Sequence, residues 1–185
     1  MAAVMATLIP TAQPVLADHT TLALLPSPLL LSPGDQDVLE VWVFGLDGPA
    51  RLTGYELTLD YDPAVIIVDA VIGGSAPFHA TPTSNIDNEI GRVTFSPNQT
   101  RGGVTEDALI ARISVMAVGD LDASTAMTFS SVELTGSLDQ SIDLGSILGG
   151  RAAVSRTAVM IGTSVVPEGS STTIPVTIFL PQKVV

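Results

Sequence analysis

Cysteine is absent from this 185-residue chain, and basic residues are few. The absence of cysteine excludes disulfide bonds, thiolate metal sites and cysteine nucleophiles. Only 7 Lys and Arg stand against 19 Asp and Glu, which gives a formal net charge of −12. A chain with this charge repels a phosphate backbone and an anionic lipid surface. Nucleic acid is therefore not an expected partner, and the acidity is typical of the soluble surface of an exported protein.

Long apolar runs and catalytic motifs are also missing. No stretch of about 18 apolar residues occurs, so membrane insertion is not expected. The chain contains no G-x-S-x-G, no H-E-x-x-H and no glycine-rich phosphate loop. Of the two histidines, His19 lies near the N-terminus and His79 lies in the proline-containing segment APFHATPT, where a loop residue is expected. No motif indicates two carboxylates facing across a cleft, as a glycosidase needs. The sequence predicts a protein that is not an enzyme, with no cofactor.

Glycine and proline are frequent, with 16 and 13 residues, and they separate short segments of alternating polarity. In LTGYELTLDYDPAVIIVDAV, residues 52–71, the apolar side chains of Tyr55, Leu57 and Leu59 alternate with polar ones up to the Asp62-Pro63 dipeptide. This alternation is typical of a strand with one buried side, and proline ends the strand because it supplies no ladder N–H. Similar segments recur between Thr21 and Ser155 without helical stretches between them. The sequence predicts an all-β fold of about nine strands in two packed antiparallel sheets.

Three regions divide the chain. Residues 1–17, MAAVMATLIPTAQPVLA, are small and apolar and end at a suitable cleavage site, but no basic residue precedes them. They are predicted to be a signal-like or disordered leader, and residues 18–156 are predicted to be one β-sandwich module.

Residues 157–185 carry an internal repeat. The segment VVPEGSSTTIPVTIF, residues 165–179, aligns without a gap with LLSPGDQDVLEVWVF, residues 30–44. The simplest interpretation is that 157–185 holds the opening strands of a truncated second repeat. Three arrangements would cover its apolar residues: a longer polypeptide, a strand folded back on its own module, or strand addition to a neighbouring copy. The last would allow self-association through 165–180 and a structural subunit that polymerises.

Several segments together resemble one protein family. The segments LTLDYDP, AVIIVDAV, GRVTFS and ALIARISVMAVG, with the opening LSPGDQDVLEVWVFG, resemble the cohesin modules of cellulosome scaffoldins over residues 22–155. The resemblance implies a nine-stranded antiparallel β-sandwich with jelly-roll topology, related in fold to some carbohydrate-binding modules. It also implies a non-catalytic module, extracellular or at the cell surface. Such a module docks a dockerin borne by an enzyme or a surface protein in polysaccharide-degrading assemblies.

The resemblance implies a binding face as well. In cohesins the dockerin lies on a sheet face that includes the strand before the Asp-Pro corner, where an Asn and an Asp stand two residues apart. Gly54 and Glu56 occupy those positions here, so the acidic acceptor is kept and the Asn side chain is lost. Alternation brings further polar side chains to the same side, although they would also suit the solvated side of a sheet. The predicted protein-binding face consists of Gly54, Glu56, Thr58, Asp60, Arg92, Thr94 and Ser96.

Carbohydrate and calcium are two other candidate ligands. Carbohydrate is the alternative to a dockerin, and Trp42 is the candidate contact because it falls on the side of its strand away from Leu39, Val41 and Val43. Calcium suits the alternating oxygen side chains of SNIDNEIG, Asn85, Asp87 and Glu89, and those of Asp35 and Asp37. No complete twelve-residue calcium loop follows, and turn formation is the commoner reason for such residues. No metal site is predicted in this chain, and the calcium expected in a cohesin complex belongs to the dockerin.

Overall fold

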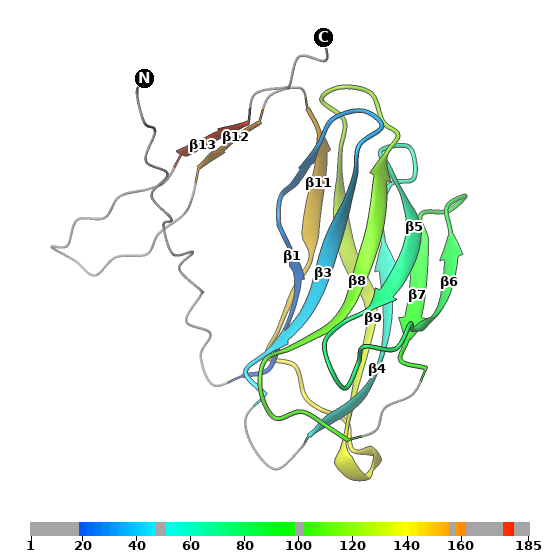
Figure 1. Cartoon of the computed structure of the whole chain (residues 1–185), viewed down its shortest axis with the longest axis vertical. Coiled ribbons are helices and arrows are strands. Elements are labelled where there is room, and N and C mark those ends of the chain that lie inside the picture. Colours follow the sequence, from blue (N-terminus) through cyan, green and yellow to red (C-terminus); the bar gives the residue numbers. More distant parts are fainter. Residues whose placement is uncertain (1–18, 47–50, 99–101, 156–157, 162–175, 180–185) are drawn as a thin grey trace, which may run out of the picture.

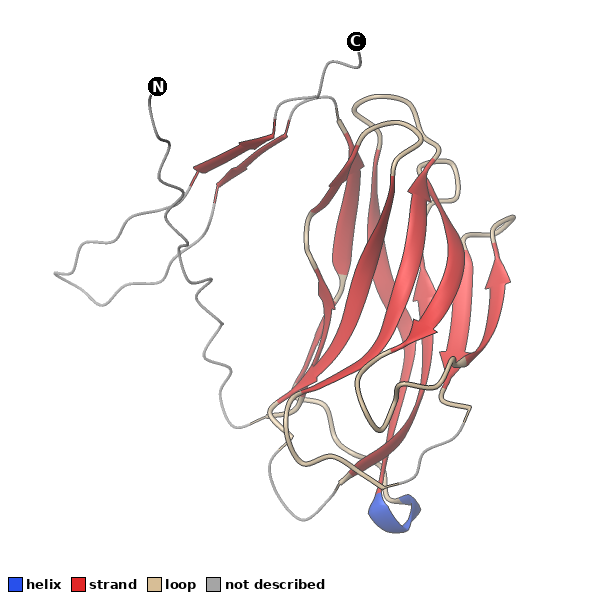
Figure 2. Cartoon of the chain, in the orientation of Figure 1, coloured by secondary structure: helices blue, strands red, loops and turns tan. Residues whose placement is uncertain are grey.

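The computed structural model describes residues 19–46, 51–98 and 102–155, together with the backbone of two short strands near the C-terminus. The leader predicted for residues 1–17 lies outside the described residues. Within them the regular secondary structure consists of strands and one short 3-10 helix (η1, Ser137–Asp139) (Figure 2). No helix in this part of the chain is long and apolar enough to cross a bilayer.

Eleven strands form two sheets, and two more strands form a small separate sheet (Figure 1). In chain order the strands are β1 (Thr21–Leu25), β2 (Leu29–Leu31), β3 (Gln36–Phe44), β4 (Leu52–Asp60), β5 (Ile66–Gly73), β6 (Thr83–Asp87), β7 (Arg92–Ser96), β8 (Ala108–Ala117), β9 (Ser124–Gly136), β10 (Ser146–Leu148), β11 (Gly150–Val154), β12 (Ala158–Ile161) and β13 (Val176–Phe179). The five-stranded sheet has the order β10-β1-β3-β8-β5, and the six-stranded sheet has the order β2-β11-β9-β4-β7-β6.

The predicted all-β sandwich is confirmed, with two differences in detail. The two sheets contain eleven strands where about nine were expected, and they are mixed because β1 pairs with β10, and β2 with β11, in parallel. Part of the difference arises at residues 26–28, where Pro26 and Pro28 divide the segment from Thr21 to Leu31 into two strands. Proline supplies no N–H for a ladder, so β1 ends there and β2 joins the opposite sheet.

Two further strands have weak sequence signals. β6 reads TSNID, and its Asn and Asp residues are of types that are depleted in strands. It forms because β7 offers a complete ladder of five paired residues. β10 spans only three residues and is the edge partner of β1.

The Asp-Pro corner moves the chain from one sheet to the other. The Asp62 carboxylate accepts a hydrogen bond of 2.9 Å from the Ala64 N–H, and the Asp62 carbonyl accepts one of 3.0 Å from the Val65 N–H. These bonds form a turn that ends β4 in the six-stranded sheet and begins β5 in the five-stranded sheet. The role of Asp62 and Pro63 in connecting the two sheets therefore accounts for their presence at this corner.

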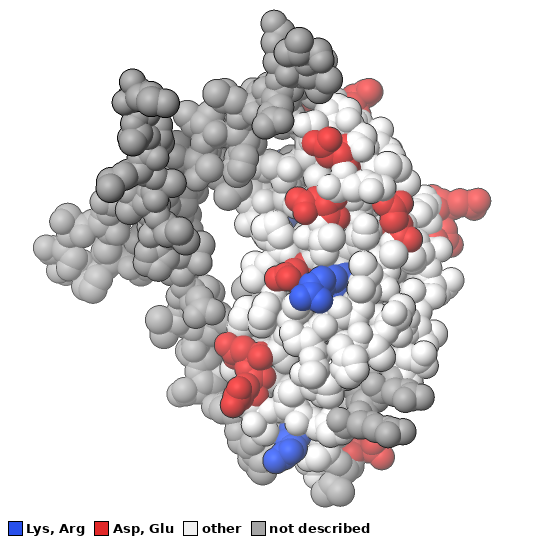
Figure 3. Space-filling view, in the orientation of Figure 1, with Lys and Arg blue, Asp and Glu red and all other residues white. Residues whose placement is uncertain are grey.

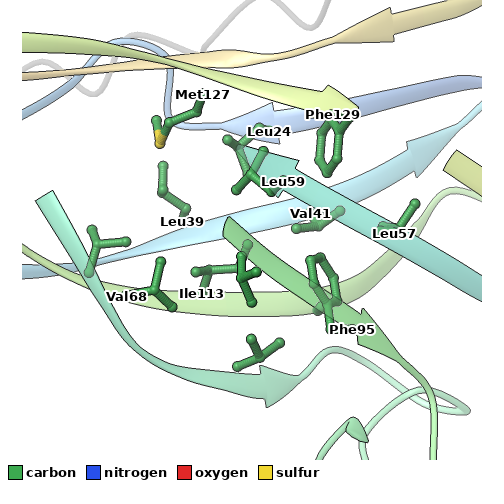
Figure 4. Packing of buried hydrophobic residues seen from close by; sticks show 14 of the residues in the cluster. Leu24, Leu39, Val41, Leu57, Leu59, Val68, Phe95, Ile113, Met127 and Phe129 are labelled. Carbon is green, nitrogen blue, oxygen red and sulfur yellow. The ribbon is translucent and has the colours of Figure 1, made fainter. Parts of the chain in front are cut away.

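The core lies between the sheets (Figure 4). Leu57, Leu59 and Phe95 point inward from the six-stranded sheet, and Leu39 and Ile113 from the five-stranded sheet. All five are at most 1% exposed. Each buried side chain of this size stabilises the fold by about 1.5–3 kcal/mol before conformational entropy is subtracted. Because the apolar residues of β4 and β7 all point inward, their polar neighbours point outward.

Candidate protein-binding face

The outward side of the six-stranded sheet carries a continuous set of polar side chains, called here the polar face. Its members come from the four adjacent strands β6, β7, β4 and β9, in that spatial order. Most are partly or fully exposed, in contrast to the buried residues between them. The polar face comprises Glu56, Thr58, Asp60, Asn85, Arg92, Thr94, Ser96, Ser131 and Glu133.

Hydroxyl groups occupy the middle row of the polar face. Thr58 is paired with Thr94 on one side and with Ser131 on the other, and Asn85 lies beyond Thr94. The Thr58 and Thr94 hydroxyl oxygens are 3.0 Å apart, which is a hydrogen-bond distance. The row presents groups that both donate and accept hydrogen bonds.

An ion pair lies in the next row. Arg92 donates from Nε to Asp60 Oδ1 at 2.7 Å and from Nη2 to Asp60 Oδ2 at 3.2 Å. This two-bond geometry fixes both side chains and lowers the pKa of Asp60, mainly through the hydrogen bonds from Arg92 and further through one from Ser130, against partial desolvation. Arg92 is therefore already occupied by Asp60.

Two carboxylates lie directly opposite each other in the row on the other side of the hydroxyl row. Glu56 of β4 is paired in register with Glu133 of β9, and both are exposed. The ion pairs within the described residues are Arg92–Asp60 and Arg112–Glu40, so neither Glu56 nor Glu133 belongs to one. Like charges directly opposite on a sheet repel each other and destabilise the pair. The fold therefore keeps an unfavourable arrangement of acceptors at this position.

Gly54 continues the same strand beyond Glu56. It is paired with Thr135, and a Cβ at Gly54 would lie 3.5 Å from the Thr135 Cβ, an ordinary contact. The φ of Gly54 is not in the left-handed region, so the backbone accepts other residues. Next to it, the Thr53 hydroxyl donates to the backbone carbonyls of Thr135 and Gly136. Gly54 is thus a gap in the polar face that a longer side chain fits.

The structure brings the seven residues predicted for this face together on β4 and β7, and that they bind a partner stays a prediction. Sequence reasoning missed Glu133, Ser131 and Asn85. Alternation in β9 marks Glu133 as outward, since its neighbour Leu134 is buried. The sequence gives no signal that β9 lies beside β4, so the two carboxylates were not connected.

Trp42 lies on the other sheet. Its ring stacks on Phe44, with centroids 5.6 Å apart and an angle of 5° between the planes. Its indole Nε1 donates to Glu40 at 3.0 Å, and Glu40 is paired with Arg112 at 3.4 Å. The side chain is half-buried on the outward side of β3. Trp42 is therefore on the opposite side of the sandwich from the polar face.

Of the residues considered for calcium, Asn85 and Asp87 lie in β6 and Asp37 in β3, whereas Asp35 and Glu89 lie between strands. Asp87 Oδ1 accepts hydrogen bonds from the backbone N–H groups of Glu89 and Ile90, and Asp35 accepts one from Ser32. Asn88, between β6 and β7, accepts from and donates to Val68 and so ties this turn to β5. In the described part of the chain no three or more His, Asp or Glu side chains are grouped to hold a metal ion.

The surface is acidic on the outward side of the other sheet too. Figure 3 shows red acidic side chains spread over the visible surface and few blue basic ones. The net charge of −12 gives the molecule a negative field, which attracts basic partners at a distance and weakens with salt.

Solved structures resemble this fold. The sixth cohesin of scaffoldin B from Acetivibrio cellulolyticus, solved with a mutant Cel5 dockerin, superposes with a TM-score of 0.62 at 13% identity, covering 74% of this chain and 99% of that chain. The non-cellulosomal cohesin from Archaeoglobus fulgidus gives a TM-score of 0.58 at 18% identity, covering 74% and 91%. The solution structure of CaCohA2 from Clostridium acetobutylicum gives 0.59 at 14% identity, covering 75% and 92%.

No family model matches the chain, and no curated protein matches it in sequence. The likeness to solved structures is a likeness of fold. The chain has the jelly-roll sandwich fold of cohesin modules, in agreement with the resemblance of its sequence segments.

Proposed function

We propose that this chain is a non-catalytic, cohesin-like docking module that binds a dockerin-type protein through its polar face. The fold supports the proposal, because the similar solved structures include cohesins in complex with dockerins. The polar face supports it further, because it lies on the sheet that contains the strand before the Asp-Pro corner.

The observation that carries the proposal is the pair formed by Glu56 and Glu133. Two exposed carboxylates in register repel each other, so the pair does not stabilise the sheet. A basic side chain or a set of N–H and O–H donors from a partner would relieve the repulsion. The adjacent hydroxyls of Thr58 and Ser131 supply neutral hydrogen bonds around the charged centre.

The partner is expected to place Lys or Arg, together with hydroxyl groups, against β4 and β9. Because Arg92 is held by Asp60, the charged groups of the polar face outside that ion pair are the acceptors Glu56 and Glu133, and the partner must supply donors to them. A long-range electrostatic attraction of this kind mainly raises the association rate and makes that rate sensitive to salt.

Calorimetric titration of the purified chain with a panel of calcium-loaded dockerins tests the proposal. At least one dockerin should bind with a Kd in the micromolar range or tighter. The double variant Glu56→Gln and Glu133→Gln should weaken that binding about 10-fold to 100-fold, because charge-assisted hydrogen bonds contribute about 1.5–3 kcal/mol.

Glu106→Gln is the matched control. Glu106 is also exposed, but it lies in the loop between β7 and β8, outside the strands that form the polar face, so its neutralisation should leave the affinity unchanged. Equal affinities of the double variant and the wild type would contradict a role for the carboxylate pair. If no dockerin of the panel binds, the proposal that the partner is a dockerin-type protein is contradicted.

Carbohydrate binding is the second candidate function. It is favoured by one observation, the parallel Trp42 and Phe44 rings on the outward side of β3. A ring that is half-buried and hydrogen-bonded to Glu40 offers less area for stacking than a fully exposed one. Protein docking is therefore the better supported of the two functions.

The proposed setting of either function is a polysaccharide-degrading assembly, outside the cell or at its surface.

A further inference from the structure

The C-terminal strands β12 and β13 form an antiparallel two-stranded sheet of their own. Their backbone pairing joins Ala158 to Phe179 and, at the other end, Ile161 to Val176. A two-stranded hairpin by itself is at best marginally stable in water. The pair therefore needs further strands to become a stable unit.

The pairing of β12 with β13 repeats the pairing of β1 with β3. In the sandwich the register is Thr21 with Phe44, Leu22 with Val43, Ala23 with Trp42 and Leu24 with Val41. In the hairpin it is Ala158 with Phe179, Val159 with Ile178, Met160 with Thr177 and Ile161 with Val176. The repeat in sequence places Val176–Phe179 on residues 41–44, so β13 corresponds to β3, and the backbone pairing then places β12 on β1. The stretches of sequence between the matched pairs, residues 25–40 and 162–175, differ by two residues in length.

The polarity pattern supports this correspondence. The register places Val159 and Ile161 at the positions of the buried Leu22 and Leu24. Val41 and Val43 are fully buried in the sandwich, and the repeat places Val176 and Ile178 at their positions. Pro175 stands immediately before β13, which is a position that a strand tolerates.

The two edges of β3 are both used in the sandwich. One pairs with β1, and the other pairs with β8 in the antiparallel sense, with Trp42 opposite Leu109 and Val43 opposite Ala108. In the hairpin, β13 pairs with β12 and with no other strand among the described residues.

From these relationships we infer that β12 and β13 are the opening strand pair of a second sandwich unit, and that the free edge of β13 takes an antiparallel strand with the pattern of β8. The strand that fits is one of alternating polarity that places small or aliphatic residues, such as Ala108, Leu109 and Ala111, opposite 176–178. The inference is independent of what the polar face binds.

An extended chain tests this inference. Residues 180–185 are replaced by a second copy of residues 45–156, so that Phe179 is followed by the residues that follow Phe44. The hairpin should then complete a second sandwich. Calorimetry should give an unfolding enthalpy roughly double that of the original chain, because this enthalpy scales with the number of folded residues. Amide exchange in peptides from residues 158–179, which are unique in the extended chain, should slow at least 10-fold relative to the original chain.

Three controls make the result specific. Ile178→Asp, at the position of the buried Val43, should abolish the second unit, whereas Thr177→Asp, at the position of the half-buried Trp42, should preserve it. An extended chain lacking residues 158–179 should show no added enthalpy. The inference is overturned if the extended chain gains neither enthalpy nor protection, if the chain without the hairpin gains both, or if the two Asp variants behave alike.

Discussion

The Tyr55 hydroxyl donates a hydrogen bond of 3.1 Å to the carbonyl of Ile110 and so joins β4 to β8 across the sandwich. The register between β3 and β8 shifts between Val41 and Trp42, and Ile110 is the residue of β8 that has no partner on β3. A bulge of this kind leaves the extra residue outside the ladder. The Tyr55 hydroxyl supplies a hydrogen-bond donor for the carbonyl of Ile110. Burial of the hydroxyl raises the pKa of Tyr55.

The Tyr55→Phe variant tests this bond. It keeps the ring, which contacts Phe78 and Phe95, and removes only the hydroxyl. Leaving a buried carbonyl without its donor should lower the free energy of unfolding by about 1–3 kcal/mol. Urea denaturation followed by circular dichroism measures the change. An unaltered denaturation midpoint would contradict a stabilising role for the bond.

The same variant should respond differently to alkaline pH. Because the pKa of Tyr55 is raised in the folded state, the unfolded chain releases this proton first, near its usual pKa of about 10. Above that pH the unfolded state binds fewer protons, so stability falls as the pH rises. Tyr55→Phe removes this contribution and should lose stability less steeply above about pH 10. Parallel slopes for the two proteins would contradict the expected linkage.

Gly54→Asn should improve binding to a dockerin. A Cβ at this position meets only the Thr135 side chain at an ordinary distance, so the free energy of unfolding should change by less than about 0.5 kcal/mol. The added amide supplies hydrogen bonds two residues from Glu56, which should tighten binding about 2-fold to 10-fold. Ser114→Asn, on the outward side of β8, is the control and should leave affinity unchanged. An affinity unaffected by Gly54→Asn would show that the partner does not reach this end of β4.

Alternation in the sequence predicts which side chains face the core and which face outward. Tyr55, Leu57 and Leu59 are buried as expected, while Thr58 and Asp60 remain accessible. This works because side-chain direction in a strand depends only on local geometry. The Asp-Pro corner is equally local, since the turn is made by Asp62 itself.

Strand order was not predictable in the same way. The neighbour of β4 in the sheet is β9, and the paired residues Glu56 and Glu133 are far apart in sequence. Nothing local specifies that pairing, which depends on how the whole chain packs. The bulge at Ile110 is similar, because the run of four buried residues from Ala108 reads as a plain apolar segment until its register with β3 is known.

Trp42→Ala separates the two candidate functions. The side chain lies on the sheet opposite the polar face, so dockerin affinity should be unchanged. Loss of the stacking contact with Phe44 and of part of a half-buried ring should lower the free energy of unfolding by about 1–3 kcal/mol. Retention on insoluble polysaccharide is the readout for the other function, and a variant that is retained as fully as the wild type would remove Trp42 as a sugar contact. A drop in dockerin affinity would indicate docking on the five-stranded sheet and would contradict docking on the polar face.

Asp60→Asn should make the free energy of unfolding less sensitive to a fall in pH. Arg92 lowers the pKa of Asp60 in the folded state, so the unfolded chain takes up this proton first as the pH falls. The stabilisation is present above the usual Asp pKa of about 4 and is lost below it. The difference in unfolding free energy between wild type and variant, measured from about pH 7 down to about pH 2, should therefore be largest near neutrality and shrink under acid. The difference should be small throughout, because the pair is exposed and screened by solvent.

Asp120→Asn, at an exposed position outside both ion pairs of the described residues, should show no such trend. A difference between Asp60→Asn and wild type that persists unchanged at the lowest pH would mean that Asp60 stabilises the sheet by some means other than its charge.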